Sequence, residues 1–167
     1  MPLAPPITDI EQLKAHPALG RLVAWNASVV EAVKFDRDEL TIWITKESIR
    51  EVCAILRDSS STACPFHYLC DLTCVDWHPS EPRFEVVYHL LSIPTKERVR
   101  LKVRLDGSSP AIESVTSVWP SANFYEREVF DLFGVRFTGH PNLKRIMMPD
   151  DWEGHPLRKD YPVEGYR

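Results

Sequence analysis

The densest group of chemically capable side chains in this sequence lies between residues 126 and 131. Glu126, Glu128 and Asp131 stand close together, and carboxylates at such spacing could act as general acid and base in an enzyme. No nucleophile and no set of metal ligands accompanies them. Two roles stay open, acid–base catalysis and structural ion pairing, and the sequence favours the second.

Four cysteines offer a second possible chemistry. Cys53, Cys64, Cys70 and Cys74 are separated by ten, five and three residues, whereas iron–sulfur and zinc sites use paired short spacings such as C-x-x-C. The first residues lack the charged and apolar regions of an export signal, so disulfides are not expected. We predict thiols buried in the core.

His140 and His155, with Asp150 and Asp151, form a third candidate, a metal site. Each histidine precedes a proline, which biases its backbone toward extended conformations. Metal ligands need a rigid scaffold, which such a segment does not offer. We expect structural polar contacts here instead.

Composition excludes several classes of function. The 167 residues fit one domain, and 44% apolar with 26% charged residues is ordinary for a globular protein. The net charge of −4 and the lack of a basic run argue against nucleic acid as a partner. No apolar run approaches the length of a membrane span. We expect the cytoplasm, or a peripheral surface facing it.

The elements that position these residues begin with a short helix capped by Thr8 and Glu11 and limited by Pro17. Residues 28–35 and 40–45 predict a hairpin, and a helix capped by Ser48 follows over residues 49–56. Residues 69–76, 84–92 and 99–105 predict three more strands, the last with one buried and one basic, solvated face. The prediction is an α+β fold: a mixed, mostly antiparallel sheet of about five strands with helices packed on it.

A third helix is predicted over residues 122–133, with Ser121 at its start and Gly134 at its end. Its helical projection puts Arg127 and Asp131 on one face as an i, i+4 pair. Glu126 falls within the apolar arc, where a carboxylate needs a partner. We expect an arginine from the following segment, Arg145 or Arg158.

Beyond Gly134 the chain changes character. Residues 135–167 carry a proline every six to eight positions from Pro141 onward, yet they are rich in aliphatic and aromatic side chains. Such a segment cannot build its own core and is too apolar for a solvated arm. We therefore predict two parts, an α+β domain over residues 1–134 and an extended, partner-wrapping C-terminal arm over residues 135–167.

This last stretch carries a family resemblance. Glu126-Arg-Glu128, Asp131-Leu-Phe133, His140, Lys144 and Ile146-Met147 resemble the signature of the 30-kDa-type subunit of respiratory complex I, the family of the NADH-quinone oxidoreductase C subunit. The continuation from Gly139 to Pro162 is also similar to that family, and residues 71–76 and 86–91 resemble its strands more loosely.

The resemblance implies a non-catalytic structural subunit in the peripheral arm of a proton-pumping NADH:quinone oxidoreductase. It implies no catalytic, cofactor-binding or metal-ligating residue in this chain, with NADH, FMN, iron–sulfur clusters and quinone held by partner subunits. The expected partners are the quinone-site D subunit and the neighbouring iron–sulfur subunits, on the cytoplasmic side of the bacterial inner membrane, with membrane contact only through the complex. The signature and interface residues it implies are Glu126, Arg127, Glu128, Asp131, Gly134, His140, Lys144, Arg145, Pro149, Asp150, Trp152, Pro156, Leu157, Arg158, Lys159, Asp160 and Tyr161.

Two alternatives remain. Within the same superfamily, membrane-bound energy-converting hydrogenases and a ferredoxin-dependent complex use a homologous subunit. A free-standing enzyme using Glu126, Glu128 and Asp131 as acid–base groups is the other, and it predicts turnover by the isolated chain.

Overall fold

The computed structural model describes residues 5–58, 60 and 64–165. Its elements follow in the order α1 (Ile10–Leu13), α2 (Pro17–Asn26), η1 (Ala27–Val29), β1 (Val30–Asp36), β2 (Glu39–Ile44), η2 (Lys46–Ser48), α3 (Ile49–Arg57), β3 (Tyr68–Asp76), β4 (Phe84–Leu91), β5 (Arg98–Leu105), β6 (Ala111–Glu113), α4 (Ala122–Phe133) and β7 (Arg136–Thr138). Residues 59–62, a Ser-Ser-Ser-Thr stretch that predicts a polar connector after α3, fall partly outside the described residues.

Five strands form one sheet in the order β1-β2-β5-β4-β3. All neighbours are antiparallel except β2 and β5, which run parallel with Leu40 opposite Val99. The β1–β2 hairpin turns at Arg37 and Asp38, whose φ angles of 53° and 61° match the left-handed turn that a tight hairpin needs. The predicted mixed, mostly antiparallel α+β fold is confirmed.

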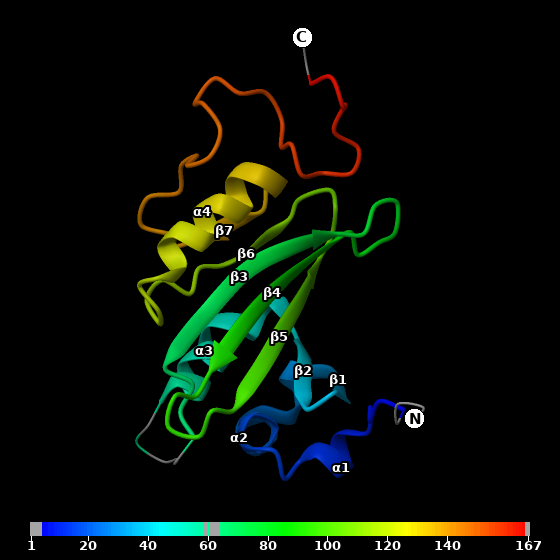
Figure 1. Ribbon diagram of the computed structural model, residues 1–167, viewed down its shortest axis with the longest axis vertical. Helices are drawn as coiled ribbons and strands as arrows, with labels where there is room; N and C mark the ends of the chain where they lie inside the picture. Colours follow the sequence, from blue (N-terminus) through cyan, green and yellow to red (C-terminus); the bar gives the residue numbers. More distant parts are fainter. Residues whose placement is uncertain (1–4, 59, 61–63, 166–167) are drawn as a thin grey trace.

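The core lies on one face of this sheet. Alternate residues of β5, among them Leu101 and Val103, are fully buried there. Figure 1 shows α3 behind the strands and α4 along β3, with no helix in front of β3, β4 and β5. Among the described residues no helix covers the opposite face, which we call the open face, although Glu85 and Val87 of β4 are buried on it.

Helix α2 corrects the expectation for the N-terminal region. Helix α1 ends before Pro17 as expected, but Pro17 also opens a second helix, α2, where its missing N–H needs no partner and His16 provides the cap. The preceding helix, α1, is capped by Asp9 rather than by Thr8, because the Asp9 carboxylate accepts the Glu11 N–H at 2.9 Å.

Helix α3 has the predicted extent and buries Ile49, Val52, Cys53 and Leu56. Ser48 stands at its cap position without making the predicted side-chain hydrogen bond. The other end is held from α2, where the Arg21 guanidinium donates to the carbonyls of residues 55, 56 and 58. These carbonyls lack helical partners of their own, so this contact ties the two helices together.

Helix α4 ends as predicted at Gly134, which has a φ of 76°, but Ser121 makes no side-chain cap. The chain then forms β7, which pairs in parallel with β6, and Val135 and Phe137 are buried in the core. The division after Gly134 stays a prediction, although residues up to Thr138 complete the packing of the α+β fold.

Candidate interaction site

Glu126 is buried, as the helical projection predicted, but its partners are not arginines. One carboxylate oxygen accepts the Ser114 hydroxyl at 2.6 Å and the other accepts the Val115 N–H at 2.7 Å. Burial raises the pKa of Glu126 to about 7, although these two hydrogen bonds oppose the change. The expected ion pair with Arg145 or Arg158 is therefore wrong, and Glu126 fastens α4 to the end of β6.

Asp131 is the carboxylate that the arm neutralises. Its Oδ1 accepts Arg145 Nη1 at 2.6 Å, and its Oδ2 accepts the N–H groups of Ile146, Met147 and Met148 at 2.9, 2.7 and 2.9 Å. Burial alone would raise its pKa, but these donors hold the pKa of the Asp131 carboxyl below its usual range. An aspartate on α4 thus organises a turn of the arm.

Arg127 does not form the predicted i, i+4 pair with Asp131. Its guanidinium donates instead to the carbonyl oxygens of Lys144 and Arg145, at 3.1 and 3.0 Å. His140 lies nearby, with Nε2 3.1 Å from the Asn123 carbonyl. Both signature residues therefore hold the first half of the arm along α4 through backbone atoms.

The end of α4 receives the second half of the arm. Arg158 Nε donates to the Phe133 carbonyl at 2.6 Å, and His155 Nδ1 lies 2.9 Å from the Asp131 carbonyl. A Cβ atom at Gly134 would stand 2.5 Å from both Arg158 Nη2 and the His155 ring. Gly134 is required here for its left-handed backbone and for the space it leaves.

A second anchor joins the arm to the β3–β4 hairpin. Arg83 binds Asp76 at 2.8 Å and Asp160 at 2.6 Å, and Asp76 also accepts the Lys159 N–H at 2.8 Å. The Arg83 and Arg158 guanidinium groups lie 4.9 and 5.2 Å from the centre of the Phe84 ring.

Three residues that hold these anchors were not predicted from the sequence: Asp76, Arg83 and Ser114. For Asp76 and Arg83 the available signal was opposite charge at the two ends of a Pro-rich hairpin. Ser114 lies in a short segment before α4 with no pattern that marks it as a partner of Glu126.

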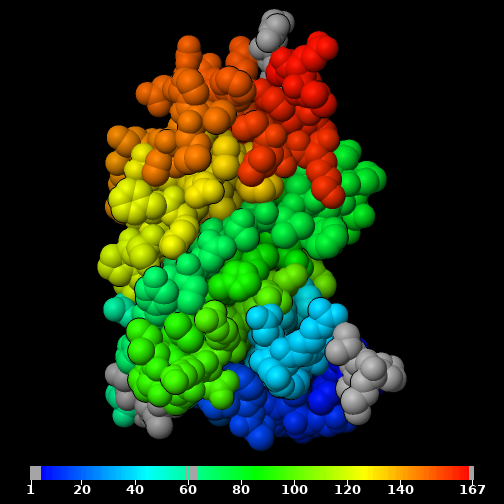
Figure 2. All heavy atoms as spheres, in the orientation of Figure 1, coloured from blue at the N-terminus to red at the C-terminus, as the bar shows by residue number. Residues whose placement is uncertain are grey.

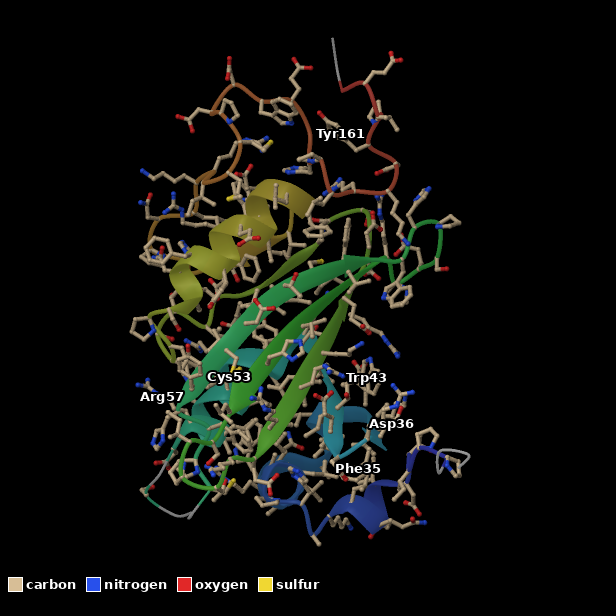
Figure 3. All side chains as sticks on the ribbon, viewed as in Figure 1. Phe35, Asp36, Trp43, Cys53, Arg57 and Tyr161 are labelled. Atoms are coloured by element: carbon tan, nitrogen blue, oxygen red, sulfur yellow. The ribbon has the colours of Figure 1, made fainter. Side chains whose placement is uncertain are left out.

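The remaining predicted site residues lie mainly at the surface. Tyr161, labelled in Figure 3, donates its hydroxyl to the Glu153 carbonyl at 3.2 Å. Pro156 is half-buried, as is the Arg145 side chain. The exposed members are Glu128, Lys144, Pro149, Asp150, Trp152, Leu157, Lys159 and Asp160.

Exposed apolar side chains occur along the arm and at the start of α4. Figure 2 shows the arm, in orange and red, lying against α4 at one end of the molecule. Met147 is 59% exposed, Leu157 is 51% exposed and Phe124 at the start of α4 is 62% exposed. We call this set the arm surface; it consists of Phe124, Ile146, Met147, Trp152, Leu157 and Val163. Exposed apolar groups held on an ordered scaffold are typical of a protein–protein interface.

Neither set of candidate metal ligands is assembled as a site. Cys53, Cys64 and Cys74 are buried as predicted, whereas Cys70 is half-buried. Burial raises the pKa of Cys74 to about 12 and that of Cys53 further, so both are thiols at neutral pH, while a metal ligand must be a thiolate. Within residues 5–58, 60 and 64–165, no group of three or more His, Cys, Asp and Glu side chains could hold a metal ion.

The helices are short. In the part of the chain that the structure describes, none combines the length and the apolar character that crossing a bilayer requires.

Comparison with protein families gives a specific match. The model described as respiratory-chain NADH dehydrogenase, 30 Kd subunit, matches residues 42–167. The C subunit of NADH-quinone oxidoreductase from Citrifermentans bemidjiense is 50% identical over 77% of this chain and 78% of its own length. The corresponding C subunit from Geobacter sulfurreducens is 46% identical over 83% of each chain.

Two solved structures share the fold. A trypsin-resistant fragment of Nqo5 matches with a TM-score of 0.61 and 30% identity, over 75% of this chain and 99% of the fragment. A chain of the membrane-bound sulfane sulfur reductase, an archaeal respiratory membrane complex, matches with a TM-score of 0.71 and 29% identity, over 87% of this chain and 84% of that chain. The chain therefore belongs to the 30-kDa subunit family of respiratory-chain NADH dehydrogenases, which includes the C subunits of NADH-quinone oxidoreductases, and is part of a multi-subunit, membrane-associated oxidoreductase.

Proposed function

We propose that this chain is a non-catalytic structural subunit in the peripheral arm of a proton-pumping NADH:quinone oxidoreductase. It docks through the arm surface against the quinone-site D subunit and stabilises the assembly through which electrons pass from NADH to quinone. The observation that carries this proposal is the arm itself, ordered on α4 by Asp131 and exposing a set of apolar side chains.

The carboxylates that could have served catalysis support a structural role. Glu126 is inaccessible and accepts two hydrogen bonds from the end of β6, while Asp131 accepts four from the arm. A catalytic acid or base must reach a substrate, and neither carboxylate touches solvent. Glu128 is exposed, and no described residue forms a hydrogen bond or ion pair with it that would orient it for catalysis.

The same proposal assigns the redox groups to partner subunits. NADH, FMN, the iron–sulfur clusters and quinone are bound by those neighbours, including iron–sulfur subunits next to this chain, and the chain contributes contact area. The complex places it at the cytoplasmic side of the inner membrane as a peripheral subunit.

The fold match to a membrane-bound sulfane sulfur reductase favours a second candidate, a subunit of a relative that takes electrons from another donor, such as an energy-converting hydrogenase or a ferredoxin-dependent complex. Identities of 45–50% to C subunits of NADH-quinone oxidoreductases, against 29% to that archaeal chain, favour the NADH-dependent form. NADH-driven quinone reduction by the complex purified through this chain distinguishes the two.

The docking is tested by copurification with a tagged full-length chain. The double substitution Met147→Glu and Leu157→Glu puts two charges on the arm surface and is expected to abolish recovery of the D subunit. Ile93→Glu is the matched control, because Ile93 is 62% exposed but lies between β4 and β5 and outside the arm surface. Undiminished recovery of the D subunit with the arm variant would refute the proposal.

A further inference from the structure

The open face carries an unusual combination of side chains near its hairpin end. Trp43 from β2 and Trp77 from the β3–β4 hairpin border a cavity of about 380 Å³, with Pro82, Glu85, Lys102 and Arg104 in its walls. Figure 3 shows Trp43 beside β5. Trp77 is 49% exposed. The solvent-facing side of an antiparallel sheet is normally polar, so two tryptophans around a cavity indicate a binding surface.

Positive charge predominates in the lining of this pocket, which contains Lys102, Arg104 and Glu85. Glu85 is the only carboxylate in its described lining, and its side chain is 6% exposed. Trp43 Nε1 donates to it at 2.9 Å and Lys102 Nζ at 2.6 Å, so its charge is satisfied from within. Arg104 lies 3.9 Å from the same carboxylate and 5.7 Å from the Trp43 ring centre, yet its side chain stays 47% exposed. The group presented outward is therefore a cation.

The positive charge extends along the strand. Arg98, Arg100, Lys102 and Arg104 alternate on the open face of β5, a row about 20 Å long at roughly 3.3 Å per residue. Arg100 is paired with Glu39 at 2.5 Å. Arg98 makes no ion pair with any described residue, so both ends of the row keep a cation available.

Tryptophan and arginine are the side chains that most often dominate the binding energy of protein interfaces. We propose that the pocket and the β5 row form a second docking surface, which takes an acidic segment of a neighbouring protein subunit. An apolar side chain of that segment fills the space between Trp43 and Trp77, and a carboxylate binds Arg104. The proposal rests on membership of a multi-subunit complex but not on docking of the arm surface.

Three tryptophans in different places make a matched experiment. Trp77 on the open face is 49% exposed, Trp25 on α2 is 45% exposed and Trp152 in the arm is 40% exposed. Hydroxyl-radical oxidation is measured by mass spectrometry on the isolated full chain and on the purified complex. Oxidation of Trp77 is expected to fall at least ~5-fold on assembly, because interfaces exclude water from central side chains, while Trp25 stays unchanged.

The outcomes separate the two docking surfaces. Protection of Trp152 without protection of Trp77 overturns the second surface and leaves the proposed function standing. Protection of Trp77 alone supports the second surface and counts against the arm. Equal protection of all three tryptophans would mean general burial and would overturn a specific site at Trp77.

Charge substitutions test the chemistry of the partner. Arg104→Glu is expected to abolish protection of Trp77 in the complex, whereas Arg50→Glu, on a side chain 49% exposed on α3, is not. With Arg104→Lys, a carbodiimide should couple the new amine to an Asp or Glu of another subunit. Absence of that product, or protection of Trp77 in the isolated chain by phosphatidylglycerol vesicles alone, would overturn an acidic protein segment as the ligand.

Discussion

Arg145 and Asp131 meet at 2.6 Å between the arm and α4, so the arginine that we expected as a partner of Glu126 binds the other buried carboxylate of this helix. The Arg145 side chain is 17% exposed and that of Asp131 is inaccessible. The second guanidinium nitrogen of Arg145 donates to the carbonyls of Trp152 and Gly154 at 2.9 and 3.0 Å. One arginine thus joins the helix to two distant parts of the arm.

Asp131→Asn is expected to release the arm and to destabilise the chain by about 3 kcal/mol, since removing one partner leaves the other charge of a buried pair uncompensated. Tryptic cleavage after Lys144 and Arg145 should accelerate, and the melting temperature should fall. Glu128→Gln, on an exposed position of the same helix, is the control and should change neither. Unchanged cleavage in the aspartate variant would show that the arm is held by other contacts.

Gly134→Ala and Gly139→Ala separate backbone strain from a clash with the arm. Both glycines have positive φ, 76° and 81°, so each alanine carries a strain of about 1–2 kcal/mol. Only at Gly134 would the new Cβ meet Arg158 and His155, whereas Gly139 has nothing within 4 Å of that position. Chemical denaturation should show a larger loss for Gly134→Ala; equal losses would mean that the arm moves aside freely.

Glu126→Gln should change how stability depends on pH. The pKa of Glu126 is about 7 in the folded chain, above its ordinary value of 4.5, so ionisation disfavours folding increasingly as pH rises from about 5 through 7. The glutamine variant is therefore expected to gain stability relative to the parent by up to about 3 kcal/mol between pH 5 and pH 8. Thermal melting at several pH values measures this difference, and parallel pH profiles would contradict it.

The attachment of the arm should weaken as pH falls, whereas the effect of Glu126 on stability appears as pH rises. Burial alone would raise the pKa values of Asp76 and Asp131, but hydrogen bonds lower both. At Asp76 the main donor is the Arg83 guanidinium, and at Asp131 the main donors are backbone N–H groups of the arm. Their stabilisation is complete above the ordinary pKa near 4 and is lost as pH falls through the lowered values. Hydrogen exchange at the Lys159 and Met147 amides should be slow at pH 5 and lose protection, relative to the intrinsic exchange rate at each pH, as pH falls below about 4. Protection that does not change over this range would show that these carboxylates do not hold the arm.

Two truncations locate the end of the core. A chain ending at Thr138 keeps Val135 and Phe137, which are 0% and 2% exposed, and should retain the near-native circular dichroism of the sheet. A chain ending at Gly134 loses both side chains and should be less stable by several kcal/mol, at about 1.5–3 kcal/mol for each buried apolar side chain. Equal stability of the two would place the end of the core at Gly134.

The sheet, α3 and α4 were predictable because their signals are local: alternation in β5, four apolar positions at helical spacing in α3, and a glycine that ends α4. The sequence does not indicate α2, because a proline such as Pro17 is equally suited to follow the end of one helix and to open the first turn of another. A helical projection of α4 puts Asp131 on the polar face, which it treats as exposed to solvent. In the structure the arm covers this face and buries Asp131. The Arg83–Asp160 pair joins residues far apart in sequence, and no local pattern indicates such a pair.

The two anchors of the arm, at Asp131 and at Arg83, fix its shape before any neighbour arrives. The conformational entropy of this segment is therefore lost when the chain folds. Association then costs less free energy, because the segment is already ordered. A chain whose arm is docked for only a fraction of the time binds with an affinity reduced by that fraction. Substitutions that never touch a neighbouring subunit can therefore emerge as assembly defects, and their severity should follow how far they unfasten the arm.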